Sequence, residues 1–256
     1  MILALLRSLL YTAWMTVTVV PWACVVIVCS AFLRPTPLWW VTVVWLRGTI
    51  LGARWICGVR YRIQGFEHLP TDPKAGAIIC PKHQSTWETF AFPTLMPHPL
   101  AYVFKRELLY IPFFGWAMSR LDMIHIDRSK RNEAWTKVAQ QGQRLMDAGN
   151  WVIMFPEGTR TPRGAKGVYK TGATRLAVAT GMPLIPIAVT SARVWPRRSF
   201  LVRPGVIDIS IGRPIVPDGR SPDELMAAVE DFIESEMRRL DPQAYVPGEP
   251  TPVERR

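Results

Sequence analysis

The fold is decided by a short apolar run that leads at once into a polar turn, Ala77-Ile78-Ile79-Cys80-Pro81-Lys82-His83-Gln84-Ser85-Thr86-Trp87-Glu88-Thr89. Its first four residues have the apolar composition of a buried strand. Ser85 and Glu88 have the spacing of a helix capping box, so a helix should begin directly after the turn. A buried strand that leads straight into a helix is the unit from which α/β proteins are built.

The same alternation continues along the rest of the chain. The predicted strands are 77–80, 100–104, 123–126, 151–155, 183–189 and 206–212, and the predicted helices are 131–148, 171–180 and 221–240. Two helices are followed by the stop signals Gly149 and Gly181, and the last begins with a capping box at Ser221 and Glu224. Alternating strands and helices imply an α/β core.

The N-terminal region has a different character. No charged residue lies between Arg7 and Arg34, and at ~1.5 Å per residue a helix there could cross a hydrocarbon layer of ~30 Å. A membrane anchor is favoured over a cleaved signal peptide, because the run is too long for a typical signal core. Pro21 lies within the run and can break a helix, so a spanning and a re-entrant segment both remain open.

A second apolar stretch, Leu38–Cys57, carries Arg47 and Arg54 on nearly the same helical face. This pattern suits a helix at the membrane interface, with its tryptophans at headgroup level. We therefore predict a membrane-anchoring helical segment over residues 1–58, an α/β domain over 59–241 and a disordered, proline-rich tail over 242–256.

The charge of the chain favours an anionic partner. The formal net charge is +11, and six arginines but no acidic residue precede Glu67. This predicts contact with an anionic phospholipid membrane, although the arginines could also be ordinary solvated groups on a helical hairpin. The chain lacks RNP-like aromatic patterns, zinc-finger spacing and Lys/Arg blocks, which argues against nucleic acid as the partner.

The four cysteines form no CxxC pair and lie in apolar surroundings, at Cys24, Cys29, Cys57 and Cys80. This usage predicts reduced thiols and argues against a disulfide framework or a zinc site. A domain on the cytosolic side of a membrane fits it.

A candidate for acid–base chemistry lies in the turn quoted above. Five residues along a continuous helix would separate His83 and Glu88 by ~140°, but from the turn before the helix His83 could fold back onto Glu88. A carboxylate against an imidazole fixes the tautomer and makes the other nitrogen a better base for a hydroxyl nucleophile. The alternative is that Glu88 only closes the helix start, and the pair alone leaves both interpretations open.

A second candidate follows the strand 151–155. Residues Pro156-Glu157-Gly158-Thr159-Arg160 form a loop at the carboxyl end of that strand, where α/β sheets bind ligands. Arg160 can hold a phosphate with two hydrogen bonds, and a loop at Lys105-Arg106 can add positive charge. The alternative is a surface loop with an exposed arginine.

A basic and aromatic run, 190–198, could meet lipid headgroups or an acidic acyl carrier, or could be a solvated loop.

In order and spacing, several blocks of the chain resemble the 1-acylglycerol-3-phosphate acyltransferases. The blocks are His83-x4-Glu88, Lys105–Trp116, Ile126-Asp127-Arg128, Phe155–Arg160 and Pro183–Ile187. The resemblance extends over residues 60–215. It implies a mixed central sheet flanked by helices, behind an apolar N-terminal helical segment embedded in a membrane.

The resemblance also implies a reaction. A fatty acyl group would pass from an acyl thioester, acyl-CoA or acyl carrier protein, to the sn-2 hydroxyl of lysophosphatidic acid and form phosphatidic acid. His83 would deprotonate the hydroxyl and Glu88 would orient His83, with no acyl-enzyme, no metal and no other cofactor. The alternatives are another acceptor, such as glycerol-3-phosphate, another lysophospholipid or a lyso-aminolipid, and a non-catalytic lipid-binding protein.

Binding residues follow from the same resemblance. It places Lys105, Arg128 and Arg160 near the substrate phosphate, with Arg106 as the alternative to Lys105. It places Glu157, Gly158 and Thr159 around the glycerol.

The chain departs from the family pattern in a few places. Glu88 stands where many relatives have Asp, and Asp122 and His125 depart from the block around Arg128. Because both donors are cytosolic, we expect a bacterial inner-membrane location with the catalytic domain facing the cytoplasm.

Overall fold

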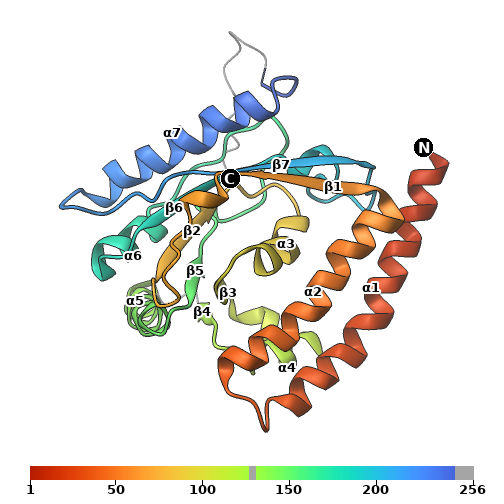
Figure 1. Ribbon diagram of the computed structural model, residues 1–256, viewed down its shortest axis with the longest axis horizontal. Helices are drawn as coiled ribbons and strands as arrows, with labels where there is room; N and C mark the ends of the chain where they lie inside the picture. Colours follow the sequence, from red (N-terminus) through yellow and green to blue (C-terminus); the bar gives the residue numbers. More distant parts are fainter. Residues whose placement is uncertain (127–130, 246–256) are drawn as a thin grey trace.

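The computed structural model describes residues 1–126 and 131–245. Within them, seven strands form one sheet in the order β1-β7-β6-β2-β5-β3-β4 (Figure 1). The strands are β1 Val59–Gln64, β2 Ala77–Pro81, β3 Leu100–Lys105, β4 Ile124–Ile126, β5 Trp151–Ile153, β6 Leu184–Val189 and β7 Gly205–Ile211. All neighbours are parallel except β6 and β7, so β1 and β7 run against the other five strands. The mixed α/β sheet expected from the sequence is confirmed.

Helices cover both faces of the sheet. They are α1 Ile2–Cys29, α2 Pro35–Cys57, α3 Trp87–Leu95, α4 Phe114–Met118, α5 Arg131–Asp147, α6 Gly172–Thr180 and α7 Pro222–Leu240, with 3₁₀ turns η1 Phe66–His68, η2 Arg106–Tyr110 and η3 Ser191–Arg193. Alternate residues of β2 separate the two apolar cores, since Ile79 joins the core under α1–α3 whereas Ile78 and Cys80 join the core under α5–α7. Figure 1 shows these two helical layers on either side of the sheet.

The sequence pattern predicts six of these strands and misses β1. Its residues are mostly exposed, including Arg60 and Arg62, and it pairs only with β7 at the edge of the sheet. An edge strand needs few apolar residues because one side of its backbone faces solvent. Strand β1 was therefore missed because it lacks the apolar composition by which the buried strands were predicted.

The N-terminal region forms a helical hairpin. Tyr11 of α1 donates a hydrogen bond to the carbonyl of Thr49 of α2 at 2.9 Å. Pro21 lies inside α1, and the helix continues on both sides of it, so the break that Pro21 could have caused is not observed. Its neighbour Trp22 donates its indole N–H to the carbonyl of Val41 at 3.0 Å, which holds this part of α1 against α2.

The two helices of the hairpin use their apolar residues differently. Helix α2 packs against α3 and buries Trp39 and Val43 in the core. Among the described residues, α1 is the one helix with the length and composition of a membrane span, and only 11% of its most apolar window is buried. By length and composition, α1 is therefore a candidate membrane span.

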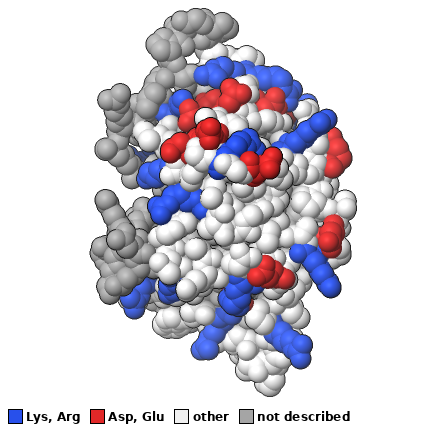
Figure 2. Space-filling view, turned by 90° about the vertical axis from the view of Figure 1, so that its left-hand side faces the viewer, with Lys and Arg blue, Asp and Glu red and all other residues white. Residues whose placement is uncertain are grey.

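The positive charge of the protein is unevenly distributed. Figure 2 shows the face with α5, α6 and α7, where acidic and basic side chains are interspersed. Helix α7 supplies acidic groups to this region, among them Asp223 and Glu230. Helices α1 and α2 contain arginines and no acidic residue, so the hairpin carries charge of one sign. A surface of this kind favours anionic lipid.

Gly65 provides a test of how tightly β1 is joined to β7. It has φ 78°, and a Cβ atom there would lie 2.1 Å from the carbonyl oxygen of Ile211. Gly181 has a similar φ of 70° with open space around it. We expect Gly181→Ala to lower the free energy of unfolding by roughly 1–2 kcal/mol, from the left-handed backbone alone. Gly65→Ala should cost clearly more, measured by denaturant unfolding in detergent; equal losses would contradict the close approach.

Candidate active site

Three chain segments meet at one edge of the sheet. Strands β6, β2 and β5 are neighbours and run parallel, so their carboxyl ends lie together. His83 follows β2, the Glu157–Arg160 loop follows β5, and Ser191 follows β6. This is the edge at which open α/β sheets bind ligands.

The turn after β2 folds His83 back onto the first turn of α3. The Nδ1 atom of His83 lies 2.6 Å from Oε2 of Glu88. The Glu88 side chain is fully buried, whereas that of His83 is 15% exposed. Since a carboxylate only accepts hydrogen bonds, Nδ1 carries the proton of the neutral ring and Nε2 is left as the basic nitrogen.

The two oxygens of Glu88 serve two purposes. Oε1 accepts the backbone N–H groups of Gln84 and Ser85, both at 2.9 Å, and the hydroxyl of Ser191. Oε2 faces His83. The capping box expected from Ser85 and Glu88 is only half formed, because Glu88 accepts the N–H of Ser85 but the N-cap of α3 is Thr86, without a side-chain cap hydrogen bond. The same carboxylate contacts the ring of His83. A buried carboxylate with this many donors is fully satisfied.

The backbone of His83 is held by the loop after β5. Its N–H donates to Oε2 of Glu157 at 2.8 Å, and its carbonyl accepts the N–H of Thr161 at 2.8 Å. The imidazole stacks on the ring of Phe155, with centroids 3.8 Å apart. Contacts on the backbone and on the ring leave His83 little freedom to turn away from Glu88.

A buried ion cluster lies beneath this turn. Nζ of Lys82 lies 2.8 Å from Oε1 of Glu157 and 2.7 Å from Oε1 of Glu234 of α7. Burial by itself lowers the pKa of Lys82, but the two carboxylates outweigh it and hold the pKa above its usual value. Burial raises the pKa of Glu157, against the opposing effect of Lys82. Tyr169 donates its hydroxyl to Oε1 of Glu234 at 2.8 Å.

The structure brings Arg160 to the histidine turn. Its guanidinium donates to the hydroxyl of Thr86, which lies in that turn, and its carbonyl accepts from Arg197 at 2.7 Å. Gly158 is exposed with φ 66°, and Thr159 is partly exposed. Glu157 is different from these neighbours, because it points under the turn and is only 2% exposed.

The remaining sites predicted from the sequence lie farther along the sheet. Lys105 ends β3, two strands from β2, and its backbone pairs with Ile126 of β4. The side chain of Lys105 and the whole of Arg128 lie outside the described residues, and Arg106 is exposed.

His125 lies on β4, with its Nε2 at 2.9 Å from Nζ of Lys137, which agrees with a strand side chain and not a second base. Burial, Lys137 and Arg106 lower the pKa of His125.

Two residues that help to hold the site, Ser191 and Lys82, were not predicted from the sequence. Ser191 lies in the run 190–198, for which a solvated loop was one expectation, yet Ser191 is fully buried. Its signal was its place directly after a buried strand. Lys82 carried no recognisable signal, because its partner Glu234 lies 152 positions away.

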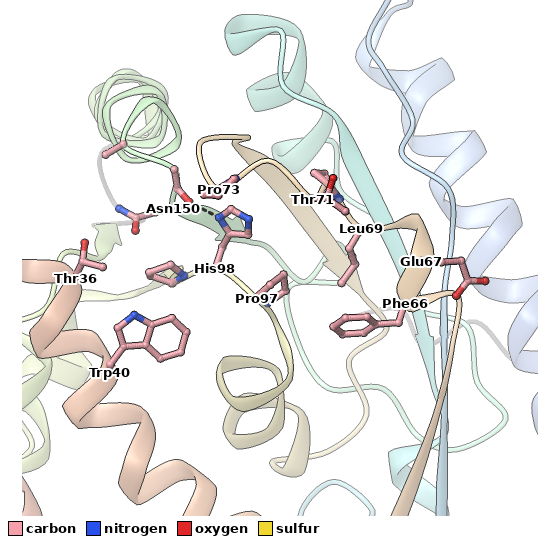
Figure 3. Close-up of a pocket in the computed structure, with 14 residues that line it drawn as sticks. Thr36, Trp40, Phe66, Glu67, Leu69, Thr71, Pro73, Pro97, His98 and Asn150 are labelled. Carbon is pink, nitrogen blue, oxygen red and sulfur yellow. Dashed lines mark hydrogen bonds between the residues drawn. The ribbon is translucent and has the colours of Figure 1, made fainter.

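A cavity of about 570 Å³ lies elsewhere in the molecule (Figure 3). Its lining includes Pro73, His98 and Asn150, which precede β2, β3 and β5, so it lies at the amino ends of strands whose carboxyl ends form the histidine site. His98 is bound to the carbonyl of Gly149 at 2.7 Å and stacks on Trp151. These contacts account for His98 as a structural residue.

Among the described residues, no cluster of His, Cys, Asp and Glu is suited to a metal ion.

Lys82 should be needed for stability. We expect Lys82→Met to lower the free energy of unfolding by about 3–5 kcal/mol, because it leaves two buried carboxylates without their cation. The control is Lys166→Met, which removes a partly exposed pair with Glu230 and should cost less than about 1 kcal/mol. Thermal and denaturant unfolding in detergent would measure both, and equal losses would contradict a buried cluster.

The chain is similar to proteins of known activity. A family model described as Acyltransferase matches residues 60–190. A 1-acyl-sn-glycerol-3-phosphate acyltransferase of Pseudomonas aeruginosa is 40% identical over 211 residues, which cover 81% of this chain and 80% of the relative. A 1-acyl-sn-glycerol-3-phosphate acyltransferase alpha of Mus musculus is 29% identical over 187 residues, covering 72% and 65%.

One solved structure has the same architecture. The crystal structure of the 1-acyl-sn-glycerophosphate acyltransferase from Thermotoga maritima matches with a TM-score of 0.78 at 24% identity, over 93% of this chain and 95% of that chain. At this identity the likeness concerns the fold.

Proposed function

The chain belongs to the acyltransferase family, among its 1-acyl-sn-glycerol-3-phosphate acyltransferases, and we propose that it acylates the sn-2 hydroxyl of 1-acylglycerol-3-phosphate to form phosphatidic acid. The reaction is a step of phospholipid biosynthesis. The observation that carries the chemistry is the contact of 2.6 Å between His83 and the buried Glu88, beside Arg160 at the carboxyl edge of the sheet. Membership of the family would not by itself identify a catalytic base in this chain.

The proposed mechanism has one base and no acyl-enzyme. Nε2 of His83 takes the proton of the hydroxyl as its oxygen attacks the thioester carbonyl. Glu88 stabilises the imidazolium that forms, because its charge lies against Nδ1. The tetrahedral intermediate then collapses, the C–S bond breaks, and the leaving thiolate takes the proton from His83. No metal or prosthetic group is needed.

Substrate recognition is assigned to the charged groups around this edge. Arg160 offers a planar guanidinium that can hold a phosphate with two hydrogen bonds. We assign Lys105 and Arg128 to the same phosphate, on the family resemblance. Gly158 and Thr159, which lie on the exposed side of the loop, are assigned to the glycerol. Glu157 is buried beneath the turn, so we assign it no direct contact with the glycerol. It acts on the site only by accepting the backbone N–H of His83.

The surroundings of the enzyme follow from its substrates. Lysophosphatidic acid resides in a membrane, and the apolar outer face of α1 suits anchoring there. The donors, acyl-CoA or acyl carrier protein thioesters, are cytosolic. We therefore propose a bacterial inner-membrane enzyme whose catalytic domain faces the cytoplasm.

Replacement of His83 tests the function directly. We expect His83→Ala to lower the rate of phosphatidic acid formation by about 10²–10⁴-fold, because the general base is lost. Product formation and release of free thiol should be measured together, with acyl-CoA and with acyl carrier protein as donor. His125→Ala is the control and should keep nearly full activity, since His125 faces Lys137. Substantial activity of His83→Ala would refute the base assignment.

Arg160 tests the acceptor. We expect Arg160→Ala to raise the KM for lysophosphatidate about tenfold or more, because a charge-assisted phosphate contact is removed. A panel of lysophosphatidate, glycerol-3-phosphate and neutral lysophospholipids should show preference for lysophosphatidate in the parent enzyme. Preference for another acceptor would overturn the proposed substrate while leaving acyl transfer intact.

Ser191 tests how Glu88 acts on the histidine. Ser191 donates to the same Glu88 oxygen that accepts the N–H groups of Gln84 and Ser85. We expect Ser191→Ala to lower kcat about tenfold with little change in the KM for lysophosphatidate, because Glu88 loses one donor and holds His83 less firmly. Ser191→Thr should restore kcat. The control is Thr190→Val, because Thr190 is equally buried but its hydroxyl accepts from the N–H of Asp208. An unchanged kcat in Ser191→Ala would show that Ser191 does not act through Glu88.

A further inference from the structure

A cluster of exposed apolar side chains follows β3. Residues 108–116 run from the second half of η2 into α4, and they leave large apolar side chains in solvent: Leu108 38%, Tyr110 69%, Ile111 44%, Phe113 37% and Trp116 50% exposed. We call this region the 108–116 surface. Elsewhere in the described part of the α/β domain, exposed large apolar residues are scattered along the chain, as at Val168 and Val216. Such a concentration marks an interaction surface.

The backbone holds this surface in place. Phe113 has φ 60° and ψ −61°, and the N–H of Phe114 donates to the carbonyl of Pro112 at 2.7 Å. This is a tight γ-turn, a strained arrangement for a residue with a side chain. At Gly115 a Cβ atom would lie 2.4 Å from the carbonyl oxygen of Leu109, so the segment packs closely on itself. Its aromatic groups are thus presented by a compact turn.

The 108–116 surface adjoins the apolar face of α1. Helix α4 packs against α1, and Figure 1 shows α4 near the turn that joins α1 and α2. In this half of α1, Val20, Val25 and Val28 are exposed. The two apolar surfaces therefore come from neighbouring elements of one side of the molecule.

The composition of the surface suits a membrane interface. Trp and Tyr favour the headgroup level, where the ring is in apolar surroundings and the polar group meets water. Arg106 and Arg120 flank the surface and are exposed, as is Glu107. With a net charge of +11 on the whole chain, an anionic bilayer is the complementary partner.

We propose that the 108–116 surface inserts into the headgroup region of the bilayer beside α1 and is a second point of membrane contact. It directly follows β3, whose carboxyl end lies at the same sheet edge as the end of β2. Insertion there would bring the opening of the histidine site to the bilayer surface, where a lysophospholipid headgroup lies. The role in substrate access rests on the proposed function, but insertion itself does not.

A probe at position 110 tests insertion without any assay of activity. Tyr110→Cys, combined with Cys24→Ser and Cys29→Ser, offers one accessible thiol, because Cys57 and Cys80 are buried. A polarity-sensitive fluorophore there should shift to the blue in vesicles of phosphatidylcholine and phosphatidylglycerol, and lipids with brominated chains should quench it. The control is a label at Val178→Cys on α6, which is 44% exposed and should remain aqueous.

Activity then tests the role in access. We expect Tyr110→Ser/Trp116→Ser to raise the apparent KM for long-chain lysophosphatidate in vesicles about tenfold. Its activity toward a short-chain, monomeric lysophosphatidate should be unchanged. The matched pair is Val168→Ser/Val178→Ser, two exposed apolar residues far from this surface in sequence, which should change neither value.

Two results would overturn the proposal. One is a label at position 110 that stays as aqueous as the label at 178 in vesicles. The other is shielding of position 110 that depends on protein concentration in detergent alone, which would identify a second copy of the chain as the occupant. A failed acyl-transfer assay with intact label insertion would refute the proposed function and leave the membrane contact standing.

Discussion

The geometry of the site depends on the buried charge of Lys82. It lies between Glu157 of the β5 loop and Glu234 of α7, and so joins the histidine turn to segments from two other parts of the fold. Removing a charge from water is unfavourable, and only good geometry with further hydrogen bonds offsets the loss. A cluster with this requirement tolerates few arrangements. The position of the turn is therefore specified more narrowly than apolar packing alone would specify it.

The effect of that cluster reaches the histidine through the backbone. Glu157 accepts the N–H of His83, and Thr161 donates to its carbonyl, so the loop after β5 holds both polar groups of the residue. Glu88 then sets the ring, supported by Ser191 from the end of β6. Three neighbouring parallel strands thus contribute to one imidazole. This explains why an imidazole can be held firmly in a turn, which by itself would be flexible.

The hairpin at the N-terminus has a different role in the fold. Helix α2 completes the core over α3, whereas α1 contributes Tyr11 to this core and leaves most of its apolar surface uncovered. Without α2 the α/β domain would expose the apolar residues of α3 that α2 covers, so the hairpin and the α/β domain share one core.

Local patterns determined much of this protein in advance. The strand before His83, the apolar stretch of α1, the capping box of α7 and the ordered blocks with His83, Glu88 and Arg160 were legible because each depends on residues close in sequence. Tertiary structure alone decided the rest. Lys82 meets Glu234, Glu88 meets Ser191, and the edge strand β1 finds β7 across long stretches of chain. Tertiary structure also decided the environment of Glu88, whose two oxygens serve the helix start and the histidine together. Spacing in the sequence can place a carboxylate near an imidazole, but only packing of distant segments decides how many donors a buried oxygen receives.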